Sequence, residues 1–83
     1  MSDNTAYLET DHTVQHLARQ YAAYSGNDNT DRILDAYEFA KKAHEGQKRA
    51  TGEPYIVHPV AVMEILIEIE VDEDTLVASL LHD

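Results

Sequence analysis

Apolar side chains recur at every third or fourth position along most of this chain, which is the spacing of amphipathic helices. The stripes predict helices over residues 11–24, 31–45, 59–70 and 73–83. The first ten residues are polar, and we expect them to be loose. The sequence therefore predicts an all-α fold of about four helices.

Turn and capping residues mark the boundaries of these segments. Gly46 is expected to end the second helix, because a glycine readily adopts the backbone conformation that follows a helix. Pro59 suits the first turn of the third helix, where its missing N–H is not needed. Asp72 is expected to cap the fourth helix, and two further acids follow it at the positive helix end.

The third segment allows a second interpretation. Isoleucine and glutamate alternate over residues 67–71, which is the period of a strand. A lone strand would lack partners, so we favour a helix. That helix is apolar round most of its girth, and we expect it to be largely buried. Val62 and Leu66 should pack against Leu76 and Leu80 of the fourth helix.

Composition narrows the class of protein. The 83 residues give room for one small domain, and the absence of cysteine excludes disulfides and thiolate zinc sites. The formal charge of −10, from 16 acids and 6 bases, argues against binding to DNA or to anionic membranes. No signal peptide is visible, and no apolar run approaches the roughly 18–20 residues of a membrane span. We expect a soluble cytoplasmic protein.

The few bases are clustered, with Lys41, Lys42, Lys48 and Arg49 within nine positions. An anionic ligand would be met here rather than by the protein as a whole. Lys41 and Lys42 are better explained as a solvated helix face. Lys48 and Arg49 fall in a turn-rich loop over residues 47–54, and they are the stronger candidates for binding.

Two histidines and an aspartate are candidate metal ligands. His58 stands just before the third helix, and His82 and Asp83 follow the apolar face of the fourth. Two imidazoles and a carboxylate suit a borderline or hard divalent ion such as manganese, iron or zinc. A His-Asp dipeptide also arises by chance, so a packing role is the alternative. No stop signal follows the fourth helix, and we expect the chain to be a truncated piece of a longer protein.

Residues 36–83 carry a family resemblance. Residues 43–59 read Ala-His-Glu-Gly-Gln-Lys-Arg-Ala-Thr-Gly-Glu-Pro-Tyr-Ile-Val-His-Pro, and the chain closes on Leu-Leu-His-Asp. This combination resembles the opening of the HD hydrolase domain in the RelA/SpoT homologue family, the synthetases and hydrolases of the stringent-response alarmone (p)ppGpp. The resemblance makes residues 31–83 the incomplete N-terminal part of that helical domain. Residues 1–30 carry no resemblance and form an N-terminal segment with one amphipathic helix.

The resemblance implies a metal site in this chain. His58, His82 and Asp83 correspond to ligands of a catalytic divalent ion, expected to be Mn²⁺. The catalytic Glu-Asp pair of the family lies downstream of Asp83, so no catalytic residue is expected within the chain. His44 belongs to the same motif, and we favour a packing role for its side chain over a site role.

The resemblance also implies a nucleotide site in the loop. Arg49 corresponds to the family's arginine that contacts the guanine base. Its planar guanidinium can stack on a purine, as an ammonium group cannot. Thr51 is a possible hydrogen-bond partner of the nucleotide, and Lys48 lies beside it. Ala50 stands where many members have lysine, so one contact is expected to be missing.

The activity implied for the parent protein is the 3′-diphosphatase reaction on guanosine-3′,5′-bis(diphosphate), with GTP pyrophosphokinase activity as a second possibility. Ribosome contact would need C-terminal regions outside this chain. Two alternatives stay open, a non-catalytic helical piece that oligomerises and a different HD phosphohydrolase acting on another nucleotide. We expect the isolated chain to be inactive and to self-associate.

Overall fold

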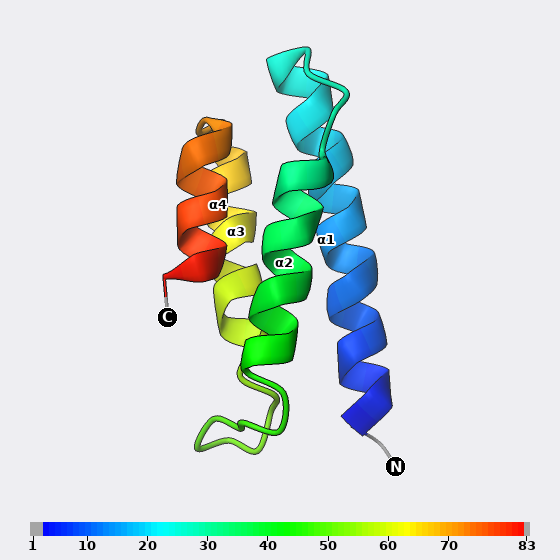
Figure 1. Ribbon diagram of the computed structural model, residues 1–83, viewed down its shortest axis with the longest axis vertical. Coiled ribbons are helices and arrows are strands. Elements are labelled where there is room, and N and C mark those ends of the chain that lie inside the picture. The colour runs from blue at the N-terminus through cyan, green and yellow to red at the C-terminus, as the bar shows by residue number, and fades with distance from the viewer. Residues whose placement is uncertain (1–2, 83) are drawn as a thin grey trace.

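Four helices make up the fold. The computed structural model describes residues 3–82, with side chains from residue 7 onward. The helices are α1 (Asp3–Ser25), α2 (Asp31–Ala43), α3 (Val57–Glu68) and α4 (Glu73–Leu81). In Figure 1, α1 and α3 run in one direction and α2 and α4 in the other. Across the described residues the only β-type pairing is an isolated bridge between Lys48 and Pro54, so the all-α prediction is confirmed.

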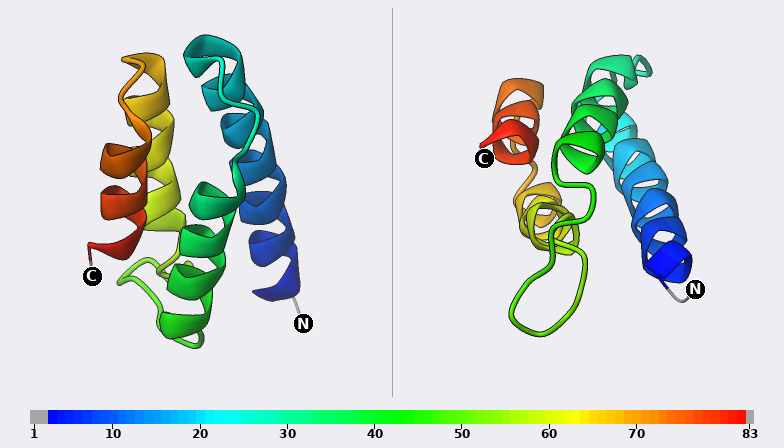
Figure 2. Two further views of the ribbon diagram at one scale, coloured as in Figure 1. Left: turned by 45° about the horizontal axis from the view of Figure 1, so that its top comes forward. Right: turned by 60° about the horizontal axis from the view of Figure 1, so that its bottom comes forward.

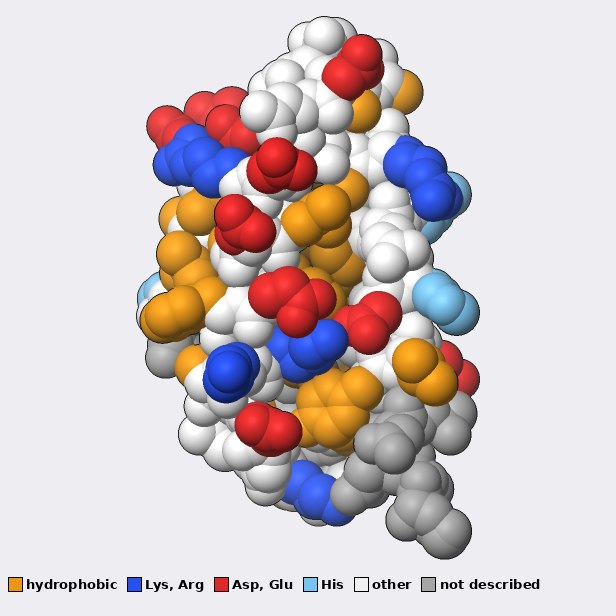
Figure 3. Space-filling model, turned by 45° about the vertical axis from the view of Figure 1, so that its right-hand side comes forward, with side chains coloured by type: hydrophobic (Ala, Val, Ile, Leu, Met, Phe, Trp, Pro, Cys, Tyr) orange, Lys and Arg blue, Asp and Glu red, His pale blue; other side chains and the backbone are white. Residues whose placement is uncertain are grey.

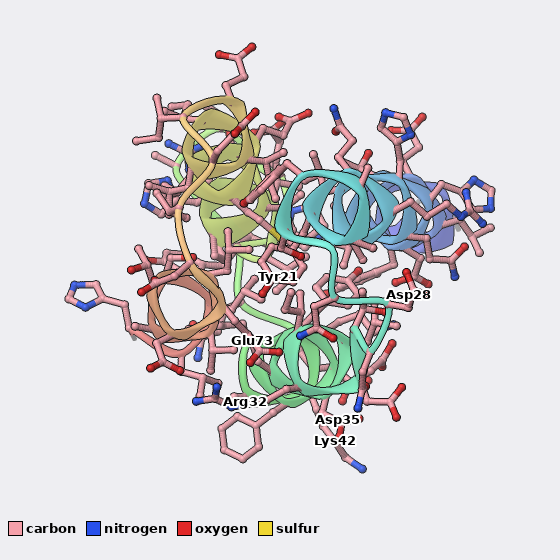
Figure 4. All side chains as sticks on the ribbon, turned by 90° about the horizontal axis from the view of Figure 1, so that it is seen from above. Tyr21, Asp28, Arg32, Asp35, Lys42 and Glu73 are labelled. Atoms are coloured by element: carbon pink, nitrogen blue, oxygen red, sulfur yellow. The ribbon has the colours of Figure 1, made fainter. Side chains whose placement is uncertain are left out.

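Seen end-on, the helices stand near the corners of a square (Figure 4). Helix α1 contacts α2 and α3, and α4 contacts the same two helices from the other side. Tyr21 of α1 points into the space that the four helices enclose. On the outside, Arg32 of α2 donates to Glu73 and Asp74 of α4 at 3.1 and 2.6 Å, which ties these two helices together.

A single hydrophobic core joins the helices. Its most enclosed side chains are Val14 of α1, Ile33 of α2, Ile56 in the turn before α3, Met63 of α3, and Leu76 and Leu80 of α4. Burying a side chain of this size contributes about 1.5–3 kcal/mol. Leu66 packs against the same core, and Val62 lines a pocket with Leu80. The predicted packing of the third helix on the fourth is therefore present.

Helix α1 begins earlier than the sequence predicted. It starts at Asp3, whereas residues 1–10 were expected to be loose. The cause is a tertiary contact, because Thr10 is buried and its hydroxyl lies 2.9 Å from the Tyr37 hydroxyl of α2. Tyr7 also packs against the core. Packing of this kind stabilises helical turns whose local sequence has no apolar stripe.

Helix α3 corrects a second expectation. The segment forms a helix rather than a strand, but α3 ends at Glu68, two residues earlier than predicted, and it is less buried than predicted. Ile65 is 63% exposed and Ile69 is 67% exposed, because α1 and α4 cover only one side of the helix. Glu70 follows the helix with a positive φ of 57°, and the Val71 N–H donates to the Leu66 carbonyl at 3.3 Å. These two features turn the chain sharply into α4.

The helix boundaries decide where the histidines lie. Helix α2 ends two residues earlier than predicted, so His44 is its C-cap and Gly46, with φ of +83°, lies in the following turn. Helix α4 starts as predicted, with Asp72 accepting a hydrogen bond from the Thr75 N–H at 2.9 Å. It ends at Leu81, which makes His82 its C-cap. Asp83 lies outside the described residues. Within residues 3–82 no helix is both long enough and apolar enough to cross a membrane.

Candidate functional site

Three histidines meet at one end of the bundle. Helix α2 ends there, α3 begins there and α4 ends there, as Figures 1 and 2 show. His44 caps α2, His58 is the second residue of α3, and His82 caps α4. All three line one pocket of about 200 Å³, which we call the histidine pocket; its other lining residues are Pro59, Val62, Ser79 and Leu80. The topology thus joins residues that lie far apart in the sequence.

The turn before α3 fixes the backbone of His58. Ile56 is 1% exposed and anchors the turn in the core. The His58 N–H donates to the Tyr55 carbonyl at 2.9 Å, and Pro59 lies in the first helical turn, where a proline loses no hydrogen bond. The His58 side chain itself is exposed, and it has no hydrogen bond or ion pair to any described residue. Its nitrogens are therefore available to a ligand.

Helix α4 brings His82 to the same pocket. The Asp72 cap fixes one end of α4, and the buried Leu76 and Leu80 fix its rotation. Because Leu80 faces the core, His82 falls at the helix end beside the pocket, with an exposed side chain. Two of the three predicted metal ligands thus line one pocket. The third, Asp83, lies outside the described residues, so its role stays a prediction.

The imidazoles of His58 and His82 are suitable ligands for a divalent ion, but two ligands do not make a complete metal site. Imidazole nitrogens are ligands for zinc and iron, and a carboxylate beside them extends the range to manganese. Among the side chains of residues 7–82, no three His, Asp or Glu groups come close enough together to hold an ion. His58 and His82 would hold it only with further ligands.

His44 is the residue that sequence reasoning undervalued. It is 9% exposed, and its Nδ1 lies 2.9 Å from Gln47 Oε1. Its ring also lies against Tyr55, with the ring centroids 4.6 Å apart. The predicted packing role is confirmed, but the same side chain also lines the histidine pocket. The signal that could have found it is a histidine placed at the end of an apolar helix stripe, where a helix end meets the core.

The basic loop forms a short hairpin at this end of the molecule. The Arg49 N–H donates to the Glu53 carbonyl at 2.8 Å, and the Gly52 N–H donates to the Arg49 carbonyl at 2.8 Å. Gly52 has φ of +94°, a conformation that favours glycine. The loop projects beyond the helices beside the end that carries the histidine pocket (Figure 2). The backbone thus holds the loop in shape before any ligand arrives.

The structure exposes all three predicted nucleotide-binding residues on this hairpin, which are Lys48, Arg49 and Thr51. The Arg49 guanidinium lies 3.7 Å from Glu53, and the Thr51 hydroxyl lies 3.5 Å from the same carboxylate. Neither contact is strong, because both partners remain in solvent. None of the three lines the histidine pocket, so the loop and the pocket are neighbouring features rather than one cavity.

Comparison with known proteins decides the family. The HD domain model matches residues 36–83, which is more than half of the chain. The chain belongs to the HD domain family. Its His82-Asp83 doublet ends the matched segment, and HD hydrolase domains generally depend on a divalent metal ion. No solved structure matches the chain.

Several curated relatives are enzymes that are named for (p)ppGpp or GTP. The bifunctional (p)ppGpp synthase/hydrolase SpoT of Escherichia coli is 55% identical over 69 residues, which are 83% of this chain and 10% of the relative. A guanosine-3′,5′-bis(diphosphate) 3′-pyrophosphohydrolase of Vibrio cholerae is 50% identical over 71 residues, or 86% of this chain and 10% of the relative. A GTP pyrophosphokinase of Myxococcus xanthus is 47% identical over 60 residues, or 72% of this chain and 8% of the relative. This chain therefore spans about a tenth of the length of these relatives.

Proposed function

We propose that this chain supplies part of the metal-dependent site of a hydrolase that removes the 3′-pyrophosphate of (p)ppGpp. The observation that carries the proposal is the meeting of His58 and His82 at one pocket, although 24 positions separate them in the sequence. The pyrophosphohydrolases among the relatives point to the same reaction. We expect the location to be cytoplasmic.

In this proposal His58, His82 and Asp83 hold a divalent ion, which we take to be Mn²⁺. When bound, such an ion lowers the pKa of a water molecule and polarises a phosphoryl oxygen. The imidazoles would bind through unprotonated nitrogens, so ion binding competes with protonation of both rings. The remaining ligand and the catalytic acids are expected from residues beyond Asp83.

The hairpin would hold the guanosine end of the substrate. The Arg49 guanidinium can stack on the purine, because its side chain is exposed to solvent. Lys48 adds positive charge near the phosphates in a protein that is otherwise acidic. Thr51, at the turn of the hairpin, offers a hydroxyl. Because the backbone hydrogen bonds already fix the loop, binding would cost less ordering entropy than a mobile loop would require.

The test compares two exposed histidines in the protein that carries this chain. His58→Ala should abolish pyrophosphate release from (p)ppGpp and weaken Mn²⁺ binding measured by calorimetry, because a ligand is lost. Any synthetase activity should persist. His16→Ala is the matched control, since His16 lies on α1 and lines a different pocket. Normal hydrolysis by His58→Ala with metal bound would overturn the assignment.

A second candidate is a non-catalytic, self-associating helical unit. Phe39 is 68% exposed and Leu81 is 44% exposed, in addition to the exposed isoleucines of α3. Apolar groups in such positions favour association. The isolated 83-residue chain should therefore release no pyrophosphate in the presence of Mn²⁺ and should run above its monomer mass in size exclusion. Turnover by a monomer would contradict this expectation. A panel of other phosphorylated nucleotides separates a different HD phosphohydrolase from both candidates.

A further inference from the structure

His44 is a buried, anchored imidazole beside a site whose other histidines are exposed. Apart from the core tyrosines, it and Thr10 are the two buried polar side chains of residues 7–82. Its Nδ1 lies 2.9 Å from Gln47 Oε1. An amide oxygen only accepts, so Nδ1 carries the hydrogen of this bond. This bond and the surrounding core fix the orientation of the His44 ring.

One aromatic ring, that of Tyr55, connects His44 to His58. The Tyr55 ring lies 4.6 Å from the His44 ring, centroid to centroid, with their planes tilted by 35°. The Tyr55 ring also lies 5.8 Å from the His58 ring, with an angle of 64° between the planes, which is an edge-on contact. Both separations fall in the range where aromatic rings attract one another, about 4.5–7 Å. The fixed ring of His44 is thus one end of a stack whose other end is His58.

The backbone under these rings is connected in the same order. The Gln47 N–H donates to the His44 carbonyl, the Tyr55 N–H donates to the Gln47 carbonyl, and the His58 N–H donates to the Tyr55 carbonyl, each at 2.9 Å. These bonds clamp the hairpin between the end of α2 and the start of α3. The stack therefore rests on a closed frame rather than on a mobile loop.

His58 has a particular need for such a neighbour. A metal-binding histidine is usually oriented by a hydrogen bond that its second ring N–H donates to a carboxylate, a carbonyl oxygen or water. Within the described part of the chain no residue accepts such a bond from His58, so no hydrogen bond fixes the orientation of its ring. The edge-on contact with Tyr55 is the ring contact that restrains it. A ring already held in one orientation binds an ion more tightly, because less rotamer entropy is lost.

We propose that His44, acting through the Tyr55 ring, is a positioning residue that holds the His58 imidazole in the orientation that binds the metal ion. The inference rests on the proposed function, because it assumes that His58 is a ligand. His44 itself contacts neither the ion nor the substrate in this assignment. It acts by the shape and rigidity of its ring rather than by charge.

Two replacements of His44 separate its ring from its hydrogen bond. His44→Asn removes the ring but keeps a donor close to the position of Nδ1, whereas His44→Phe keeps a ring and removes the donor. In the protein that carries this chain, the Mn²⁺ dissociation constant measured by calorimetry should rise about tenfold in His44→Asn. In His44→Phe it should stay close to that of the wild type. The reverse order would overturn the proposal, because the hydrogen bond to Gln47 would then be the important element.

The middle of the stack gives a second test in case His44 variants fold poorly. Tyr55→Leu should weaken Mn²⁺ binding to a similar extent as His44→Asn, whereas Tyr55→Phe should retain most of the wild-type Mn²⁺ affinity.

Thermal unfolding of the metal-free variants shows whether any of them has lost the fold. A general loss of structure would lower kcat at every metal concentration. A positioning defect should instead be relieved as Mn²⁺ approaches saturation. Loss of kcat in His44→Asn that persists at saturating Mn²⁺ would overturn the proposal.

One control distinguishes failure of this inference from failure of the proposed function. If His58→Ala leaves the Mn²⁺ dissociation constant unchanged, His58 is not a ligand and the proposed function fails with the inference. If His58→Ala weakens binding but His44→Asn and Tyr55→Leu do not, the inference alone is overturned. His16→Asn, on the exposed face of α1, should leave metal binding unaffected.

Discussion

Two clusters of polar side chains in this molecule differ in how completely they are paired. On the α1–α2 side, the buried Tyr37 hydroxyl donates to Asp11 Oδ1 at 2.5 Å and lies 2.9 Å from the Thr10 hydroxyl. Lys41 donates to the same carboxylate at 3.0 Å. We call this group the α1–α2 network. In the histidine pocket, by contrast, the side chains of His58 and His82 have no hydrogen-bond partner among the described residues.

This difference in hydrogen bonding distinguishes side chains that stabilise the fold from side chains that are available to bind a ligand. Burial, aided by the hydrogen bond to Asp11, raises the pKa of Tyr37, so its hydroxyl keeps its proton and remains a donor. Figure 3 shows acidic and basic side chains over an apolar strip on the side that carries α1 and α2. A paired network of this kind adds stability because it leaves no buried polar group unsatisfied. The exposed side chains of His58 and His82 add little stability in this way, and their ring nitrogens remain available to a metal ion.

The largest expected effect is the loss of hydrolysis when a histidine of the histidine pocket is replaced. His82→Ala should abolish (p)ppGpp hydrolysis in the protein that carries this chain, because it removes a ligand. The free energy of unfolding should change by no more than about 0.5 kcal/mol, as expected for an exposed side chain without partners. Activity assays and denaturant titration of one preparation measure both. A large loss of stability would show that His82 supports the fold and would remove the contrast.

The second largest effect is a loss of stability when the α1–α2 network is disrupted. Tyr37→Phe leaves the ring in the core but removes the hydroxyl that Asp11 and Thr10 share. It should destabilise the fold by about 1–3 kcal/mol, because the hydrogen bond from the buried Tyr37 hydroxyl to the charged Asp11 carboxylate is lost together with the contact to Thr10. Metal affinity should not change, since Tyr37 lies outside the histidine pocket. Urea unfolding and Mn²⁺ calorimetry give the two readouts. An equal loss of both would mean that the two regions are coupled.

The sequence predicted the parts of this fold that depend on local periodicity. The start of α2 at Asp31, the Asp72 cap and the core positions Leu76 and Leu80 follow from spacing and capping chemistry alone, whereas the predicted end of α2 at residue 45 was two residues too late. The start of α1 does not, because the turn around Thr10 is stabilised by Tyr37, which lies 27 positions away. The exposure of Ile65 was also missed. An apolar pattern gives the character of a helix but not how many neighbours cover it.

The candidate site divides in the same way. Residue type and family resemblance selected His58 and His82, and the structure brings both to one pocket. The place of His44 beside them could not be read from the sequence, because it depends on which helix ends meet in space. Nor does the sequence reveal the ring contacts through Tyr55, which need the hairpin to fold back between α2 and α3. The metal role of Asp83 stays a prediction.

A smaller effect is expected at the basic hairpin, where the contacts of Arg49 and Thr51 with Glu53 are weak. Arg49→Lys keeps the charge but removes the planar surface for stacking on a purine. A stacking contact of this kind is worth roughly 1–2 kcal/mol when desolvated, so the KM for (p)ppGpp should rise about tenfold with little change in kcat. The Arg49–Glu53 pair is exposed, so stability should hardly change. An unaltered KM would argue against base stacking.

The smallest effect concerns the pH dependence of the α1–α2 network. Burial raises the pKa of Asp11, but the hydrogen bonds from Tyr37 and Lys41 outweigh it and hold the pKa below the ordinary value of 3.8. A carboxylate whose pKa is depressed by folding adds stability above the unfolded pKa, and this stability is lost as the pH falls through the folded pKa. Asp11 is partly exposed, so the contribution should be only about 0.5 kcal/mol.

Asp11→Asn should therefore be slightly less stable than the wild type at pH 7, and the difference in the free energy of unfolding should narrow as the pH drops below 3.8. Chemical unfolding of both proteins between neutral and acidic pH measures this difference. A gap that stays constant over the range would show that the Asp11 charge does not contribute, and that the network is held together by Tyr37 and Thr10 alone.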